Sequence, residues 1–174
     1  MVITLDQAPD ERQLALISAQ LGRPPRGIDA VTATDGEGTP LVLRMHSLVD
    51  GAPFPTLYWL CSDRLKVAIS HLEAAGVIKA LERQLAEDDA MMAAYRRSHE
   101  DYVAQRWHHM NDETRHAVTA RGFDELLRTR GVGGISNWTQ VRCLHTQYAH
   151  HLCGDNVIGR WIDEHHPEVA ACLP

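Results

Sequence analysis

The sequence lacks an excess of basic residues, and this absence excludes several kinds of partner. Lysine and arginine number 17 against 23 aspartates and glutamates, which gives a formal net charge of −6. The basic residues are scattered among acidic ones, so we expect neither a nucleic-acid-binding nor a membrane-binding surface. The partners that remain are a small molecule, an unidentified protein, or a second copy of the chain in a homo-oligomer.

Long hydrophobic runs are absent as well. No apolar stretch approaches the roughly 18 residues that a transmembrane helix needs. The start, Met-Val-Ile-Thr-Leu-Asp-Gln, has neither the basic beginning nor the apolar centre of a signal peptide. We therefore expect a cytoplasmic protein. In a reducing cytosol the four cysteines do not form structural disulfides, which leaves metal binding, thiol chemistry or plain burial as their roles.

Three motifs of common enzyme classes are also missing. The segment Gly131-Val132-Gly133-Gly134 precedes a predicted helix, but it lacks the lysine and the preceding buried strand of a phosphate-binding loop. No Gly-x-Ser-x-Gly elbow of a serine hydrolase occurs. The neighbouring carboxylates Asp88 and Asp89 lie in a solvated run of charges, which gives no support to glycosidase chemistry.

The pattern of apolar residues predicts an α+β fold in a single domain, residues 1–174. The first part, residues 1–61, contains a helix over residues 10–21 and then strands over residues 28–34, 40–47 and 56–61. Short turns join these strands, so they form a small three-stranded antiparallel sheet. The second part, residues 62–174, is mostly helical: the predicted helices begin near residues 63, 77, 88, 112 and 136, and a short one follows residue 157.

The segment between the first helix and the first strand, Arg23-Pro24-Pro25-Arg26, has two interpretations. Paired prolines force an extended backbone, which is typical of a stiff linker. Two arginines on such a linker can instead form an anion-binding loop. The sequence leaves both open.

Thiols and imidazoles are concentrated between Gly131 and Gly159. A helix beginning at Ser136 or Asn137 and ending at Gly154 would place His145 on its apolar stripe and Cys143, His150 and Cys153 on roughly the opposite face. His150 and Cys153 have the i,i+3 spacing at which two side chains can share a metal ion. Cys143 and His150 would lie about 10 Å apart along the helix axis. A metal ion bound by Cys143 would therefore take its other ligands from elsewhere in the chain.

Cys61 is the partner that we expect for Cys143. It ends the third predicted strand and precedes a helix capped by Ser62 or Asp63, and the partial positive charge of a helix N-terminus stabilises a thiolate. The candidate metal ligands are therefore Cys61 and Cys143 as thiolates and His150 or His145 as the imidazole, with Cys153 and His151 as residues that could join them. Each of these residues also has a purely structural interpretation, because free cysteine and lone histidine often only fill a core.

Several segments of the sequence resemble those of a known family. They are Gln20 to Gly27, Pro53 to Cys61, Gly131 to Ile135, and Cys143-Leu144-His145 followed by Ala149-His150. In this order they are similar to the bacterial domain-of-unknown-function family 501. The resemblance implies that Cys61, Cys143, His145 and His150 match reactive positions of that family. The chain departs from it at Ser62, where relatives often carry proline, and it lacks a cysteine pair that some relatives have between the first two strands.

Three functional hypotheses follow. The first is a metal-binding protein, in which thiolates and an imidazole hold zinc or iron. The second is a thiol enzyme, with a cysteine nucleophile and a histidine base; if residues 143–145 are helical, Cys143 and His145 point to different faces and cannot form that pair. The third is an adaptor whose long helices bind another protein. No catalytic residue is assigned at this point.

Overall fold

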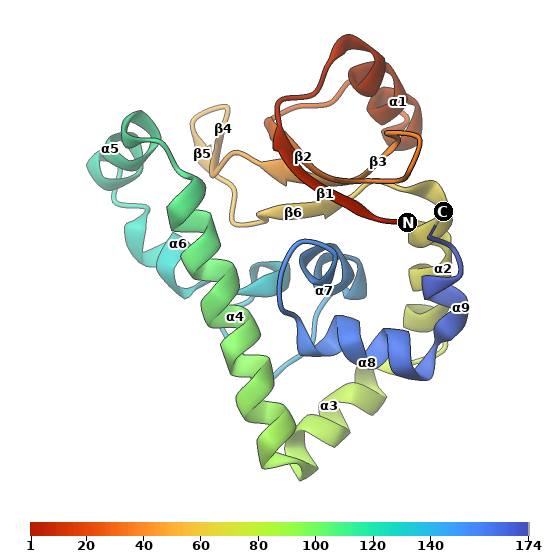
Figure 1. The fold of residues 1–174 in the computed structure, drawn as a ribbon. Helices are drawn as coiled ribbons and strands as arrows, with labels where there is room; N and C mark the ends of the chain where they lie inside the picture. Colours follow the sequence, from red (N-terminus) through yellow and green to blue (C-terminus); the bar gives the residue numbers. More distant parts are fainter. Residues whose placement is uncertain (174) are drawn as a thin grey trace.

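A computed structural model describes residues 1–173, and Pro174 lies outside the described residues. An antiparallel sheet forms the N-terminal half (Figure 1). Its strands, in spatial order, are β1 (Ile3–Gln7), β2 (Ile28–Thr34), β3 (Pro40–Met45) and β6 (Tyr58–Leu60). A separate hairpin, β4 (Leu48–Val49) with β5 (Ala52–Pro53), lies between β3 and β6 in the chain. In the strand order of the main sheet, β6 lies at one edge.

One helix covers one face of this sheet. Helix α1 (Glu11–Leu21) begins at Asp10, whose side chain accepts the Gln13 backbone N–H in a capping box, and ends at Gly22 in the left-handed conformation. Its fully buried Ile17 packs with Val31, Leu43, Met45 and Cys61 in a small apolar cluster. These sheet residues share one face because side chains alternate along a strand.

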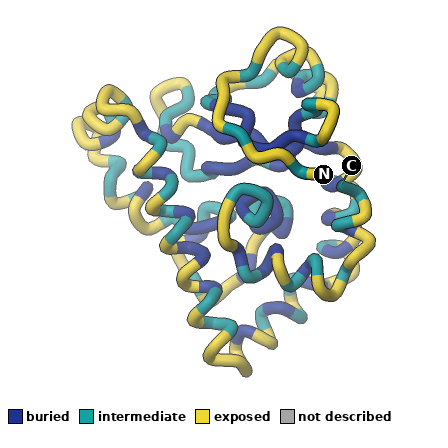
Figure 2. Tube along the Cα trace, viewed as in Figure 1, coloured by how far each residue is buried: buried dark blue, intermediate teal, exposed yellow. Residues whose placement is uncertain are grey.

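The other face is covered by the helical part of the chain, in which α7 (Leu144–His151) occupies the centre (Figures 1 and 2). Around it lie α2 (Asp63–Ala74), α3 (Val77–Glu87), α4 (Asp89–His109), α8 (Val157–His165) and α9 (Pro167–Ala170). Tyr58 and Leu60 of β6 belong to the large core that these helices form with the sheet. The buried side of α7 consists of five residues: Leu144, Gln147, Tyr148, Ala149 and His150.

A smaller lobe caps the end of α4. It consists of α5 (Asp112–Ala120), α6 (Asp124–Thr129) and a 3-10 turn over Val132–Gly134. The buried Arg106 guanidinium fixes this lobe to α4, because it donates to the backbone carbonyls of Leu127, Arg130 and Pro55. None of the helices in residues 1–173 is long and apolar enough to cross a membrane.

The α+β prediction is confirmed, and the predicted number of strands is wrong. The main sheet has four strands, because residues 3–7 pair with β2. Most side chains of β1 are exposed, so its sequence carries little of the alternation between apolar and polar residues that identifies a half-buried strand. The hairpin β4–β5 was not predicted either, and each of its strands has only two residues.

The late helix is shorter than predicted. It begins at Leu144, while the predicted start was Ser136 or Asn137. Side chains from other helices bind the backbone donors of the preceding loop: Glu82 accepts the Val141 N–H, and Glu73 accepts the Leu144 N–H. Those N–H groups are therefore satisfied without an additional turn of helix. The tail also differs, since two helices, α8 and α9, stand where one was expected.

Candidate functional site

Cys143, His145 and Glu73 meet at the N-terminus of α7. One ligand atom from each of the three side chains can be chosen so that all three atoms lie within 4.8 Å of one another. Glu73 comes from the end of α2, about 70 positions earlier in the chain. In the described residues, this is the one group of three or more histidine, cysteine or acidic side chains with such a spacing.

The backbone at Cys143 has an unusual conformation. Its φ is +53° and its ψ is 89°, which is the left-handed region that residues with a β-carbon rarely adopt. Its carbonyl oxygen nevertheless starts α7, because it accepts the N–H groups of Thr146 and Gln147 as well as the Thr146 hydroxyl. Cys143 therefore precedes the helix, and the expected separation of its side chain from that of His145 does not apply.

The Gly133 turn packs directly against this backbone. Gly133 has a φ of +75°, and a β-carbon added there would lie 2.9 Å from the carbonyl oxygen of Arg142. A residue with a side chain at this position would push residue 142 away and with it the adjoining Cys143. The glycine-rich segment that precedes the helix thus serves close packing of two loops.

Glu73 and His145 hold each other in place. The Glu73 Oε1 atom accepts the Leu144 N–H at 2.6 Å and lies 3.2 Å from Nδ1 of His145. The other ring nitrogen, Nε2, lies 3.1 Å from the carbonyl oxygen of Lys66 and 3.2 Å from the Ser70 hydroxyl. A carbonyl oxygen only accepts hydrogen bonds, so Nε2 carries a hydrogen and Nδ1 faces both Glu73 and the cluster.

The surroundings shift the pKa values of the thiol and the imidazole in opposite directions. Burial alone raises the pKa of Cys143, but hydrogen bonds from His145 and from the Thr146 N–H, together with the charge of His145, outweigh burial and lower it. The hydrogen bond to Cys143 and the charge of Glu73 raise the pKa of His145 against the opposing effect of burial. Both shifts favour a thiolate beside an imidazolium, and they also favour a thiolate that is ready to bind a metal ion.

A pocket of about 390 Å³ opens beside the cluster. Cys143, His145 and Thr146 form one side of it, and Thr56, Trp59, Leu60, Lys66 and Gly133 form the remainder. The side chains of His145 and Glu73 are 23% and 28% exposed, so the cluster is neither sealed in the core nor spread on the surface. A small molecule in this pocket would contact Cys143 and His145.

The structure does not bring Cys61 to this cluster. Cys61 is fully buried in the apolar layer beneath α1, and its thiol donates to the Pro40 carbonyl oxygen at 3.3 Å. Burial raises the pKa of this thiol to about 12. Because side chains alternate along β6, Cys61 lies on the α1 face with Trp59, while Tyr58 and Leu60 face the helices. The expected pairing of Cys61 with Cys143 at one metal is therefore not what the fold provides.

His150 is likewise held elsewhere. It is fully buried, its Nε2 lies 3.1 Å from an Asp101 carboxylate oxygen, and its Nδ1 lies 3.2 Å from the Asn156 amide nitrogen. Its ring stacks on Tyr58 and meets the edge of Tyr102. Burial lowers the pKa of His150 despite the nearby carboxylate, which is the environment of a neutral core histidine with both nitrogens satisfied.

Two other candidates, Cys153 and His151, and the remaining cysteine, Cys172, lie apart from the cluster. The Cys153 thiol donates to the Thr32 hydroxyl at 3.2 Å, and burial raises its pKa to about 12. His151 pairs with Asp163 at 2.8 Å on α8, and the Cys172 thiol donates to the Glu168 carbonyl oxygen. None of the three belongs to the group of ligand atoms at Cys143.

Sequence reasoning missed Glu73. The residue lies near the end of an amphipathic helix, where a glutamate is usually solvated, and its partners are more than 70 positions away. No spacing rule connects it to Cys143 or His145. The one available signal was its position: Glu73 lies four positions after the buried Ile69 and therefore on the same face of the helix.

Comparison with known proteins gives one match. A family model described as "Protein of unknown function (DUF501)" matches residues 31–164. No curated protein and no solved structure matches the chain. The matched part contains most of the sheet, all of α2 and α7 and therefore the whole cluster of Glu73, Cys143 and His145. The family model covers well over half of the chain, and the chain therefore belongs to the DUF501 family.

Proposed function

We propose that the protein binds a transition-metal ion, with zinc as the first choice, through Cys143, His145 and Glu73. The observation that carries the proposal is the approach of three different ligand types to within 4.8 Å of one another at one side of a pocket. Thiolate, imidazole and carboxylate are the groups that zinc prefers. Iron is the alternative, because a mixed set of ligands does not choose between the two metals.

The short distance in the cluster fits this chemistry. Tetrahedral zinc with bonds of about 2.0–2.3 Å separates its ligand atoms by roughly 3.3–3.7 Å. His145 Nδ1 and Glu73 Oε1 are 3.2 Å apart, close to that value. The hydrogen bond from Nε2 to the Lys66 carbonyl oxygen would orient the ring for metal binding at Nδ1, which is the usual arrangement around a metal-bound histidine.

Three protein ligands beside a pocket indicate a site for chemistry. Structural zinc sites are usually closed by four protein ligands, whereas catalytic sites keep a position for water or substrate. The 390 Å³ pocket is lined by Cys143 and His145 and would give room for such a water or substrate. The ion would polarise an oxygen atom of a bound molecule or activate water there.

Metal analysis of protein purified without a polyhistidine tag tests the proposal. We expect one equivalent of zinc or iron in the wild type or after reconstitution. Cys143→Ala and His145→Gln should abolish stoichiometric binding, and Cys61→Ala, which removes a thiol outside the cluster, should retain it. Wild-type protein that holds no metal after reconstitution, or a Cys61→Ala variant that loses metal as fully as Cys143→Ala, would contradict the proposal.

A second function, thiol catalysis, is favoured by a different observation. The lowered pKa of Cys143 and the raised pKa of His145 describe an activated thiolate, and the Lys66 carbonyl oxygen orients the imidazole from its other nitrogen, Nε2. The thiolate would attack an electrophilic carbon, and His145 would give its proton to the leaving group. Rapid alkylation of Cys143 well below pH 8.5 in protein that binds no metal would favour this second function over the first.

A further inference from the structure

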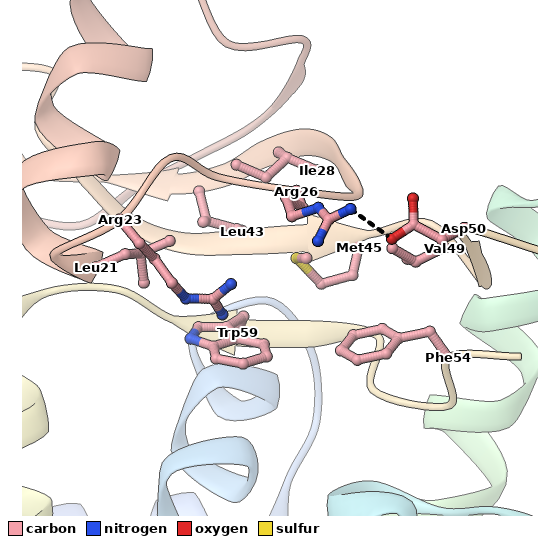
Figure 3. A pocket seen from close by; sticks show the side chains of 10 residues that line it. All are labelled: Leu21, Arg23, Arg26, Ile28, Leu43, Met45, Val49, Asp50, Phe54 and Trp59. Atoms are coloured by element: carbon pink, nitrogen blue, oxygen red, sulfur yellow. Dashed lines mark ion pairs between the residues drawn. The ribbon is translucent and has the colours of Figure 1, made fainter. Parts of the chain in front are cut away.

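A second pocket, of about 220 Å³, lies on the α1 side of the sheet (Figure 3). Its apolar lining comes from the sheet and the hairpin: Ile28, Leu43, Met45, Val49, Phe54 and Trp59. Phe54 and Trp59 stack with their ring centroids 6.2 Å apart, which gives the pocket a flat aromatic wall. Two arginines, Arg23 and Arg26, reach over this apolar lining from the loop after α1.

The loop that carries these arginines is stiff. Pro24 and Pro25 restrict its backbone, and glycines in the left-handed conformation, Gly22 and Gly27, lie at its two ends. A β-carbon at Gly27 would come within 2.5 Å of a Val49 methyl group, so the end of the loop is pressed onto the β4–β5 hairpin. The two guanidinium groups are therefore presented from a fixed backbone, which lowers the entropic cost of binding a ligand.

The charges around this pocket favour an anion. Arg26 pairs with Asp50 at 2.9 Å, whereas Arg23 forms no ion pair within residues 1–173. Figure 3 shows the Arg23 guanidinium above the Trp59 indole, where it faces the pocket. Two arginines and one aspartate line the pocket, so its lining carries a net positive charge. The chain as a whole has a net charge of −6. Guanidinium groups bind carboxylate and phosphate through paired N–H donors.

Trp59 connects this pocket to the cluster at Cys143. The same residue lines both pockets, because β6 is an edge strand that also contacts α7. Together the two pockets fall within the range of about 300–1,000 Å³ that is usual for small-molecule sites.

We propose that the pocket under Arg23 and Arg26 binds the anionic end of the substrate of the Cys143 site. The substrate class is a small molecule with a carboxylate or phosphate group and a flat apolar body. The anion would lie between the two guanidinium groups, the body would lie against Trp59, and the reacting atoms would extend toward Cys143. The assignment of this pocket to a substrate rests on the proposed function, while its affinity for an aromatic anion does not.

Titration with phenyl phosphate tests the proposal, with phenol and inorganic phosphate as the two partial probes. Binding is followed by the NMR signal of the Trp59 indole N–H, assigned with a Trp59→Phe variant. We expect phenyl phosphate to bind at least fivefold more tightly than either partial probe and to shift the Trp59 signal. The amide signals of Gly133 and Thr146, which line the Cys143 pocket, should shift with it.

Variants of the charged residues give effects of opposite sign. Arg23→Gln should weaken phenyl phosphate binding about fivefold, the upper range for an exposed ion pair. Asp50→Asn should strengthen it by a similar factor, because it frees Arg26 from its intramolecular partner. Arg97→Gln on α4 removes an exposed arginine far along the chain and should change nothing.

Three results would overturn the proposal: equal binding of phenol and phenyl phosphate, equal effects of Arg23→Gln and Arg97→Gln, or shifts that leave Gly133 and Thr146 unchanged. The Cys143→Ala protein separates this proposal from the metal site. That variant should lose metal and still bind phenyl phosphate with wild-type affinity. Loss of phenyl phosphate binding in Cys143→Ala, with its fold intact, would contradict an anion subsite formed by the arginines.

Discussion

Glu73 and Glu82 allow a direct test of which contacts at the late helix belong to the site. Both glutamates are partly buried and accept a backbone N–H of the loop before α7: Glu73 from Leu144 at 2.6 Å, Glu82 from Val141 at 3.0 Å. Glu73 alone also contacts His145. Replacing each by glutamine keeps the size of the side chain and removes its charge, so the two variants differ mainly in what happens at His145.

The expected magnitudes follow from these contacts. A hydrogen bond to a charged acceptor stabilises a fold by about 1.5–3 kcal/mol, and partial exposure of both glutamates reduces this to about 1–2 kcal/mol. For a chain of this size, that loss lowers Tm by roughly 2–8 °C in either variant. Zinc affinity should separate them. Glu73→Gln replaces a charged ligand by a neutral one and should weaken binding at least tenfold, about 1.4 kcal/mol, whereas Glu82→Gln should not.

Competition with a chromophoric zinc chelator at neutral pH measures the affinities, and thermal unfolding of the metal-free proteins measures the loss of stability. Zinc should raise the Tm of wild type and of Glu82→Gln by similar amounts, because a ligand that binds only the native state stabilises it. The increase should be smaller for Glu73→Gln. Equal zinc affinities in the two variants, with equal losses of stability, would refute the role of Glu73 as a ligand and leave it as a helix-positioning residue.

Three further predictions concern single positions. Iodoacetamide should modify Cys143 first at neutral pH and Cys61 and Cys153 last, because burial raises the pKa of both thiols to about 12 while that of Cys143 is lowered, and peptide mass spectrometry over time would show the order. Burial, with a smaller effect of a neighbouring histidine charge, lowers the pKa of His99 to about 4, below the unfolded value of about 6.5. The neutral ring therefore stabilises the fold fully above pH 6.5, and this contribution, at most about 3 kcal/mol, is lost as pH falls toward 4. The free energy of unfolding in urea should depend less on pH in His99→Gln than in wild type over this window. The same pH dependence in both proteins would contradict the lowered pKa of His99. Gly133→Ala should lower both stability, by about 1–2 kcal/mol, and zinc affinity, whereas Gly122→Ala has a similar positive φ with open space around it and should lower stability alone. Unchanged zinc affinity in Gly133→Ala would show that the loop contact does not position Cys143.

The sequence identified local structure better than long-range contacts. The strand predicted for residues 28–34 has those bounds in the structure, and Asp10 and Ser62 cap helices as the capping rules predict. These features depend on neighbouring residues. The start of the late helix depends instead on Glu73 and Glu82, which bind backbone N–H groups of a distant loop, and no local pattern in residues 136–144 carries that information.

At the candidate site, too, the sequence identified neighbouring residues better than distant ones. The concentration of thiols and imidazoles near residue 143 pointed to two residues that the structure brings together, Cys143 and His145. Cys61 was expected beside Cys143 and His145 because it lies where the third predicted strand meets a helix. Alternation along β6 places it on the opposite face of the sheet from Leu60, and the sequence-based argument did not apply this rule to the last residue of the strand.

The left-handed backbone of Cys143 determines which residue types are favourable at this position. A residue with a β-carbon in that conformation costs about 1–2 kcal/mol relative to glycine, and asparagine tolerates the conformation better than most residues. Selection for thermal stability alone would therefore favour glycine or asparagine over cysteine at this position. If the proposed site is correct, the lower stability at Cys143 is the trade-off between stability and activity that is expected at a working site.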